Sequence, residues 1–276
     1  MVDRYCLIGG DVTHSLSPAM MNAAFASMKI DAEYRPMSIA RKDFPEKFLD
    51  LRGESKGMNV TIPYKSDVIP FVDELDEVAS RIGAVNVIKH EGDRFLGYNT
   101  DAGGIVESLK DHGRESPRTA LLVGAGGAAR AFCEAMHQLR CGRVTVVVRE
   151  ASRGERFIVE MERVFPGMKF GFTTFSRLKE TDADVIFNAT PVGSGDHEVP
   201  ESLKRVIYGR ATVFDAVYRP MKTELLRTAE LRGCHVIYGY EMLLNQGVLA
   251  LENWTGRPAP RETMRKALLD SLEVAA

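Results

Sequence analysis

The chain of 276 residues carries 36 lysines and arginines against 38 aspartates and glutamates, and 45 % of its residues are hydrophobic. This length accommodates one large domain or two medium ones. The net charge of -2 argues against nucleic acid or an anionic membrane as a partner. No stretch of sequence is long and apolar enough to predict a transmembrane helix.

Cysteine usage and the first residues indicate the compartment. The cysteines show no C-x-x-C spacing and no clustering with histidine; they are Cys6, Cys133, Cys141 and Cys234. We therefore expect buried thiols in a reducing compartment, with no disulfide framework and no metal site. Asp3 and Arg4 precede a short apolar run, a pattern unlike that of a signal peptide. The expected location is the cytoplasm.

Strand-like and helix-like patterns alternate along most of the chain. The expected strands cover residues 5–8, 32–37, 57–60, 84–88, 120–123, 144–148, 185–188, 212–214 and 235–237. The expected helices cover residues 18–28, 102–110, 128–139, 153–164 and 224–231. This alternation predicts an α/β fold in which helices cover mainly parallel sheets. From Gly239 onward the pattern is helical with a break at 256–258, and we expect this segment to pack back across a domain.

Short polar segments follow strand-like runs in the first hundred residues. They are HSLSP at 14–18, GMNVTIPYK at 57–65, GAVN at 83–86 and GYNTD at 97–101. Their hydroxyls, amides, lysine and carboxylate are the groups that a small polyhydroxylated acid needs around it. Ser17 before Pro18 is typical of a helix N-cap with proline at the first helical position. We expect the hydroxyls of Ser15 and Ser17 at this helix N-terminus, which favours an anionic group.

A glycine-rich segment follows the strand expected at 120–123. It reads G-x-G-x-x-A at 124–129 and leads into a helix. The first glycine permits a tight turn, the second permits close approach of a pyrophosphate, and the helix N-terminus faces the phosphates. With a second strand at 144–148, the pattern predicts a doubly wound, Rossmann-type nucleotide-binding domain. The residues expected to contact the cofactor are Gly124, Ala125, Gly126, Gly127 and Ala128.

The end of the second strand indicates which dinucleotide binds. An NAD site places a carboxylate there, whereas an NADP site places arginine against the 2′-phosphate. Arg149 and Arg153 match phosphate oxygens, because a guanidinium binds them in a bidentate manner. Glu150 lies between them and favours NAD. The balance favours NADP, with NAD as the less favoured alternative.

Eight motifs occur in a fixed order along nearly the whole chain. They are H-S-x-S-P, G-x-N-V-T-x-P-x-K, G-A-V-N, G-x-N-T-D, G-A-G-G-A-x-R-A, N-A-T-P, D-x-x-Y-x-P-x-x-T-x-L-L and G-x-x-M-L-x-x-Q. In these motifs the chain resembles the shikimate dehydrogenase family, the shikimate/quinate branch of the NADP-dependent oxidoreductases. The resemblance implies reversible, NADPH-dependent reduction of 3-dehydroshikimate to shikimate, a step toward chorismate and the aromatic amino acids.

The resemblance also implies roles for single residues. Lys65 and Asp101 match the catalytic pair, in which the lysine exchanges a proton with the substrate oxygen and the carboxylate orients the lysine. The implied substrate contacts are Ser15, Ser17, Asn59, Thr61, Asn86, Tyr218 and Gln246. Further implied cofactor contacts are Thr190, Val192, Gly239 and Met242. The implied domains are residues 1–101 with 239–276 for substrate and residues 102–238 for NADP.

Plainer roles exist for several of these residues. Alone, Lys65 would be interpreted as a solvated turn lysine and Asp101 as a helix N-cap, and only the set of motifs reverses this. Tyr218 could equally be a core tyrosine, and Met242 could fill a helix interface. The segment 148–150 reads Val-Arg-Glu where the family often has Asn-Arg-Thr or Asn-Arg-Ser, which weakens the NADP assignment.

Two other functions remain open from the sequence. One is a quinate/shikimate dehydrogenase of broader specificity that uses NAD or NADP. The other is a nucleotide-sensing module without turnover, although a sensor has no chemical need for both Lys65 and Asp101. The expected partner is a small-molecule substrate, and the oligomeric state stays open, with a homodimer as one option.

Overall fold

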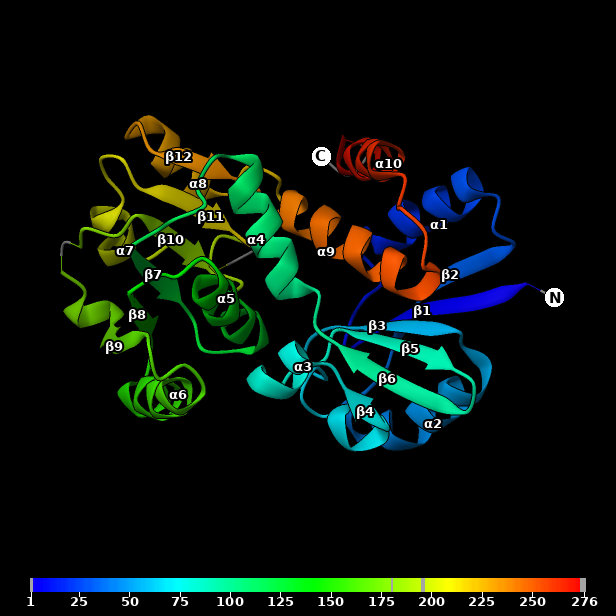
Figure 1. The fold of residues 1–276 in the computed structure, drawn as a ribbon. Coiled ribbons are helices and arrows are strands. Elements are labelled where there is room, and N and C mark those ends of the chain that lie inside the picture. Colours follow the sequence, from blue (N-terminus) through cyan, green and yellow to red (C-terminus); the bar gives the residue numbers. More distant parts are fainter. Residues whose placement is uncertain (1, 180, 195–196, 274–276) are drawn as a thin grey trace. The chain divides into compact units, whose positions relative to one another are not determined.

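The computed structural model describes residues 2–179, 181–194 and 197–273 (Figure 1). Contacts within the chain divide it into two compact units, one made of Met1–Gly104 with Leu243–Ala276 and the other of Ile105–Met242. The chain passes between the units within two helices, α4 (Asp101–Asp111) and α9 (Gly239–Thr255). The substrate and cofactor domains expected at 1–101 with 239–276 and at 102–238 stay a prediction about function.

The first unit contains a six-stranded mixed sheet in the order β2-β1-β3-β5-β6-β4. Its strands are β1 (Asp3–Gly9), β2 (Ala32–Ser38), β3 (Gly57–Val60), β4 (Glu74–Leu75), β5 (Val87–Glu91) and β6 (Arg94–Tyr98). Strand β1 pairs in parallel with β2 and β3, and β4 pairs in parallel with β6. Strand β5 runs antiparallel to both β3 and β6. The buried centre of this sheet carries the polar side chains described below.

Helices cover this sheet. They are α1 (Ser17–Met28), α2 (Phe44–Glu54), α3 (Glu77–Ile82), the C-terminal part of α9, and α10 (Arg261–Glu273). The turn that begins at Gly256, with φ of +64°, separates α9 from α10, and α10 packs against α1. Trp254 of α9 fits against Gly57 of β3, where a Cβ atom would lie 2.6 Å from the indole Nε1. The C-terminal helices therefore complete the core of the first unit, as expected from their lack of a strand.

The second unit contains a six-stranded, fully parallel sheet in the order β12-β11-β10-β7-β8-β9. Its strands are β7 (Thr119–Val123), β8 (Arg143–Val148), β9 (Lys169–Thr174), β10 (Val185–Asn188), β11 (Thr212–Asp215) and β12 (His235–Ile237). Numbered within the unit, this is the strand order of the dinucleotide-binding Rossmann fold. The strand order reverses between β7 and β10, and ligands of such sheets bind at the carboxyl ends of the strands at that point.

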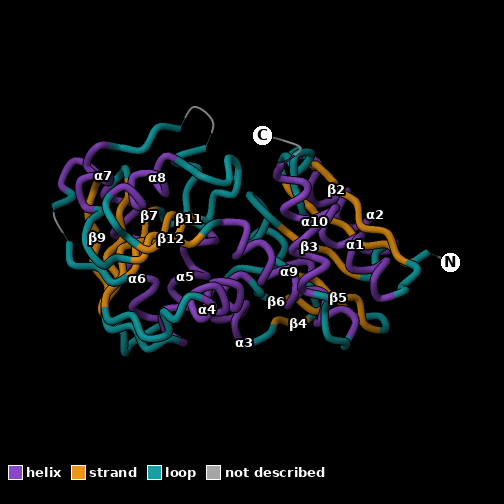
Figure 2. The backbone as a smooth tube through the Cα atoms, turned by 90° about the horizontal axis from the view of Figure 1, so that it is seen from above, coloured by secondary structure: helices purple, strands orange, loops and turns teal. Residues whose placement is uncertain are grey.

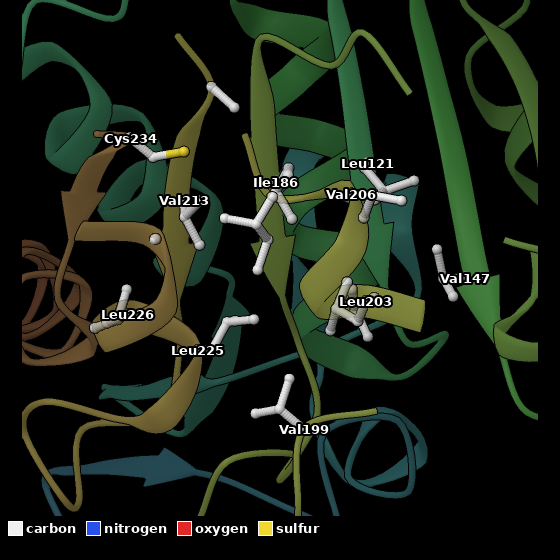
Figure 3. Close-up of a cluster of buried hydrophobic side chains, with 14 residues drawn as sticks. Leu121, Val147, Ile186, Val199, Leu203, Val206, Val213, Leu225, Leu226 and Cys234 are labelled. Atoms are coloured by element: carbon white, nitrogen blue, oxygen red, sulfur yellow. The ribbon is translucent and has the colours of Figure 1, made fainter. Parts of the chain in front are cut away.

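Helices lie on both faces of the parallel sheet. Figure 2 shows the strands as a layer between α5 (Gly127–Gln138) with α6 (Ala151–Val164) and α7 (Glu201–Val206) with α8 (Glu224–Leu231). Continuous apolar strands allow this, because the central strands β7, β10 and β11 are buried on both faces. Figure 3 shows the cluster on one face; its labelled members are Leu121, Val147, Ile186, Val199, Leu203, Val206, Val213, Leu225, Leu226 and Cys234. The predicted fold class, two domains with mainly parallel sheets, is confirmed.

Several elements differ from the sequence prediction. Strand β5 begins at Val87 rather than at residue 84, because residues 84–86 form the irregular segment that enters the site. Strands β4, β6 and β9 and helices α2, α3 and α7 had not been expected. Among the helices of the described ranges, none is long and apolar enough to cross a membrane.

Candidate active site

Lys65 and Asp101 form an ion pair in the first unit. The Lys65 Nζ donates to Asp101 Oδ2 at 2.5 Å, and the two side chains are 15 % and 7 % exposed. Lys65 follows β3 through a short turn, and its backbone oxygen accepts from the Val85 amide at 2.7 Å. Asp101 is the first residue of α4. A lysine held in this way keeps its ammonium at a fixed point, largely shielded from solvent.

The second carboxylate oxygen of Asp101, Oδ1, also accepts a hydrogen bond. Asn86 Nδ2 donates to Asp101 Oδ1 at 2.9 Å and lies 3.1 Å from Thr100 Oγ1. Asn86 Oδ1 accepts from the Thr100 amide at 2.7 Å. Asn86 is 2 % exposed, so these contacts replace those with water and fix the plane of its amide. Both oxygens of Asp101 therefore have defined partners.

Asn59 and Tyr34 extend this chain of polar groups. Asn59 Nδ2 donates to the backbone oxygen of Asn86 at 3.2 Å, and Tyr34 donates its hydroxyl to Asn59 Oδ1 at 2.7 Å. Burial raises the pKa of Tyr34 well above its usual value, so the phenol remains a hydrogen-bond donor at neutral pH. Tyr34 was missed from the sequence, because an aromatic residue in a strand reads as core. The orientation of Asn59 depends on it.

Gln246 reaches the same cluster from α9. Its Oε1 lies 3.4 Å from Asn86 Nδ2, and its own Nε2 donates to Leu243 O at 2.8 Å. The backbone around Gln246 approaches Gly104 of α4 so closely that a Cβ atom at residue 104 would lie 2.9 Å from the Gln246 nitrogen. The glycine therefore allows two helices to meet beside Asp101. The structure thus brings Lys65, Asn59, Asn86, Asp101 and Gln246 together, and their roles toward a substrate stay predictions.

The start of α4 decides between two roles for Asp101. Asn99 Oδ1 accepts from the amides of Asp101 and Ala102 at 3.1 and 3.3 Å, so Asn99 supplies the capping oxygen. Asn99 Nδ2 in turn donates to Ala84 O at 2.9 Å. The alternative of Asp101 as a plain N-cap is therefore wrong, because its carboxylate is turned toward Lys65 and Asn86 instead.

The cap expected at Ser17 is a second correction. Helix α1 begins at Ser17 itself, Leu16 precedes it, and no side chain makes a capping hydrogen bond there. Instead the Ser17 amide donates to Ser15 Oγ at 3.2 Å. Both hydroxyls still lie in the first turn of a helix or just before it, where an anion is favoured. Thr61, half-buried after β3, accepts from the Tyr64 amide through its backbone oxygen.

The glycine-rich loop of the second unit lies between β7 and α5. Gly124 has φ of +105°, a conformation that favours glycine, and a Cβ atom there would lie 2.6 Å from Thr190 Cγ2. No heavy atom lies within 4 Å of the position where Gly126 would carry a Cβ. The N-terminus of α5 is therefore open to a ligand, and its backbone N–H groups can bind a pyrophosphate. The residues of this loop fit a dinucleotide.

Two arginines lie beside this loop. Arg149 and Glu150 are exposed at the end of β8, and Arg153 is exposed in the first turn of α6. Arg153 Nη2 approaches Ala125 O at 3.5 Å, so its guanidinium extends back over the glycine-rich loop. Positive charge therefore lies at the end of the second strand and beside the glycine-rich loop, and its role toward a 2′-phosphate stays a prediction.

The remaining predicted contacts lie in loops and at a helix start of the second unit. Thr190 and Val192 follow β10 and are half-buried, and Tyr218 is half-buried between β11 and α8. Gly239 opens α9 where a Cβ atom would lie 2.5 Å from Val217 O, so the backbones meet there. Met242 is 7 % exposed. Their roles toward a cofactor or substrate stay predictions.

Metal-binding side chains and reactive thiols are not part of this arrangement. In the part of the chain that the structure describes, no group of three histidine, cysteine or acidic side chains could hold a metal ion. The four cysteines are free and buried. Burial raises the pKa of the Cys6 thiol to about 12, and it raises the pKa of Cys133 as well. These thiols are therefore protonated and unreactive near neutral pH.

Comparison with protein families assigns both ends of the chain. Residues 7–88 match the model of the shikimate dehydrogenase substrate binding domain, and residues 239–269 match that of the shikimate 5′-dehydrogenase C-terminal domain. A shikimate dehydrogenase (NADP(+)) of Dehalococcoides mccartyi is 42 % identical, with 94 % of this chain and 93 % of the relative covered. One of Natronomonas pharaonis is 42 % identical over 98 % of this chain and 100 % of the relative.

Solved structures give the same assignment. Shikimate 5-dehydrogenase of Thermus thermophilus in complex with NADP(H) and shikimate is 30 % identical, with a TM-score of 0.85 and coverage of 99 % of this chain and 100 % of that one. Quinate dehydrogenase of Corynebacterium glutamicum in complex with NAD is 26 % identical, with a TM-score of 0.89 and coverage of 98 % and 99 %.

Proposed function

The chain belongs to the shikimate dehydrogenase family, and we propose that it reduces 3-dehydroshikimate to shikimate with NADPH in a reversible reaction. The observation that carries this proposal is the buried chain of hydrogen bonds from Lys65 through Asp101, Asn86 and Asn59. The relatives are named as NADP(+) enzymes. Binding of NADP by the second unit accounts for its open glycine-rich loop. We place the reaction on the route to chorismate and aromatic amino acids, in the cytoplasm.

Proton transfer is the task of Lys65. Reduction of a ring ketone produces an alkoxide, and the Lys65 ammonium, fixed by Asp101 at 2.5 Å, donates a proton to that oxygen. In the reverse direction the neutral amine removes the hydroxyl proton. A positioned acid or base of this kind contributes about 10²- to 10⁴-fold in rate. Asp101 stabilises the ammonium and keeps it from swinging into solvent.

Substrate recognition is assigned to the amides and hydroxyls around this pair. Asn59, Asn86 and Asp101 bind ring hydroxyls, because their polar atoms face the same buried centre as Lys65. Ser15 and Ser17 bind the ring carboxylate, since they lie at the N-terminus of α1 where backbone N–H groups are free of intrahelical partners. Thr61, Tyr218 and Gln246 complete the proposed contacts.

NADP binding is assigned to the second unit. The nicotinamide, when bound, supplies the hydride. Residues 124–128 hold the pyrophosphate at the N-terminus of α5, and Arg149 and Arg153 bind the 2′-phosphate. We assign the nicotinamide half to Thr190, Val192, Gly239 and Met242.

The first experiment is an assay of the purified chain with shikimate and with quinate, each against NADP⁺ and NAD⁺. Formation of reduced nicotinamide is followed by absorbance. Shikimate with NADP⁺ should give the highest kcat/KM. Lys65→Ala should lower kcat by about 10²- to 10⁴-fold. The matched control is Lys89→Ala, which removes a lysine of the same unit that pairs with Glu91 and has no contact with the cluster. A Lys65→Ala variant within threefold of the control contradicts the mechanism.

The main alternative is a quinate/shikimate dehydrogenase that uses NAD or both cofactors. Glu150 beside Arg149 favours it, and so does the structural likeness to a quinate dehydrogenase complexed with NAD. Higher kcat/KM with quinate or NAD⁺ in the same assay would select this function. Binding of nucleotide without turnover for any pair would select a sensor. The homodimer stays a prediction, for light scattering to test.

A further inference from the structure

Asp215 is a fully buried carboxylate at the carboxyl end of β11. It is 0 % exposed, and no positively charged side chain pairs with it in the described part of the chain. Three groups donate to it: Asn188 Nδ2 at 2.8 Å, the Val217 amide at 3.0 Å and Thr223 Oγ1 at 2.6 Å. Burial without a counterion destabilises a carboxylate, and the three hydrogen bonds that Asp215 accepts offset this cost.

Asn188 connects Asp215 to the loop after β10 by hydrogen bonds. While its Nδ2 donates to Asp215, it also donates to Val192 O at 2.8 Å. Its Oδ1 accepts from both the amide and the hydroxyl of Thr190, at 3.1 and 2.6 Å. Every polar atom of the Asn188 side chain is thus used to shape residues 189–193. Thr190 in turn packs on Gly124, the first glycine of the dinucleotide loop.

The other two donors fix a second loop and a helix. The Val217 amide lies at the start of the segment between β11 and α8, which carries Tyr218. Thr223 caps α8, because its Oγ1 accepts from the Leu226 amide at 3.2 Å while its proton goes to Asp215. One carboxylate therefore anchors both ends of this segment and, through Asn188, the loop after β10.

We propose that Asp215 is a positioning residue for cofactor binding, which holds the loops after β10 and β11 in the conformation that receives the nicotinamide half of the dinucleotide. This inference rests on the proposed function. Both loops follow the carboxyl ends of neighbouring strands beside the point where the strand order reverses, where dinucleotides bind. Asp215 itself is buried beneath them, so it acts only through Asn188, Val217 and Thr223.

The test is Asp215→Asn, which keeps the shape but replaces one acceptor by a donor. Its Oδ1 can still accept from Asn188, whereas its amide then faces the Thr223 hydroxyl, whose proton loses its acceptor. We expect the Kd for NADP⁺, measured by calorimetry without substrate, to rise about tenfold. We also expect faster amide hydrogen exchange at 189–193 and 216–222. The KM for shikimate should change less than twofold. Thr223→Ser, which keeps the hydroxyl, should bind like the native chain, and Thr223→Val should resemble Asp215→Asn.

The matched control is Asp184→Asn. Asp184 directly precedes β10, at the amino end of the strand whose carboxyl end carries Asn188, and it accepts from the amides of Arg118 and Thr119 at 2.8 and 3.0 Å. This substitution should leave the Kd for NADP⁺ unchanged. If Asp215→Asn only reduces the amount of folded protein, Vmax falls while Kd and KM stay constant, and that result overturns the positioning role. Hydrogen exchange at the native rate in both loops overturns it as well. A native chain that binds neither NADP⁺ nor NAD⁺ overturns the proposed function and the positioning role with it.

Discussion

Gly57 at the start of β3 lies against the indole of Trp254, and its replacement by alanine tests the packing of the first unit. A Cβ atom at this position would lie 2.6 Å from Trp254 Nε1 and 2.8 Å from both Cδ1 and Cε2. These contacts are far shorter than van der Waals distances, so the ring or the strand must shift. Both lie in the same compact unit, and Gly57 belongs to the strand that carries Asn59.

The indole has little room to move. Trp254 is 8 % exposed, and its ring packs against Tyr5 and Tyr34 with centroid distances of 5.0 and 6.2 Å. Its Nε1 donates to Ile88 O at 2.9 Å, and a shift of the ring breaks this bond inside the core. Overpacking costs about 1–3 kcal/mol, and a buried unsatisfied donor costs about 1–3 kcal/mol. We therefore expect Gly57→Ala to lower the free energy of unfolding by about 2–6 kcal/mol.

Urea titration followed by fluorescence measures this effect. Trp254 is the one tryptophan of the chain, so its emission reports the unfolding of the first unit. The control is Gly53→Ala in α2, where no atom lies within 4 Å of the new Cβ, and alanine in a helix stabilises by up to about 1 kcal/mol. The two variants should move the midpoint in opposite directions. A Gly57→Ala chain within about 0.5 kcal/mol of the native one would refute the reasoning, because ordinary surface changes have that size.

Three further predictions concern the two sites and pH. Arg149→Ala should raise the KM for NADP⁺ far more than that for NAD⁺, and equal effects would contradict a phosphate-binding role. Tyr34→Phe leaves the buried Asn59 Oδ1 without its donor at 2.7 Å, so the KM for shikimate should rise about tenfold while that for NADP⁺ stays constant. Burial raises the pKa of Asp215 to about 6 from 3.8, so its stabilising contribution is full below pH 3.8 and is lost as pH rises through 6. Relative to Asp215→Asn, the native chain should lose about 3 kcal/mol of unfolding free energy over this range, and a constant difference would contradict the shift.

The central strands could be predicted from the sequence because they are buried on both faces. Residues 57–60 and 185–188 were predicted to the residue, and every position of these two strands is buried. Residues 235–237 were also predicted to the residue, although β12 is an edge strand in which only Ile237 is buried. Strand β9 was missed, since it is an edge strand without a fully buried residue and with a glycine at its centre. The two-residue strand β4 carries too little pattern for any periodicity to show.

The residues of the site could be predicted from motifs, but the hydrogen bonds between them could not. Lys65, Asp101 and Asn86 stand in ordered motifs, and the structure joins them by hydrogen bonds. Tyr34 escaped because a buried phenol differs from a core aromatic residue only in the partner of its hydroxyl. Ser17 was predicted as an N-cap from the preference of serine for that position before a proline. The helix begins one residue earlier than predicted, so Ser17 is its first residue.

The four native cysteines are buried, so they should compete little for thiol-reactive spectroscopic labels. With every native cysteine at most 8 % exposed, maleimide reagents should react first with a cysteine introduced at the surface. Leu49 of α2 and Leu231 of α8 are 52 % and 89 % exposed, and each belongs to a different compact unit. A donor dye at one and an acceptor at the other would convert the separation of the two units into an optical signal.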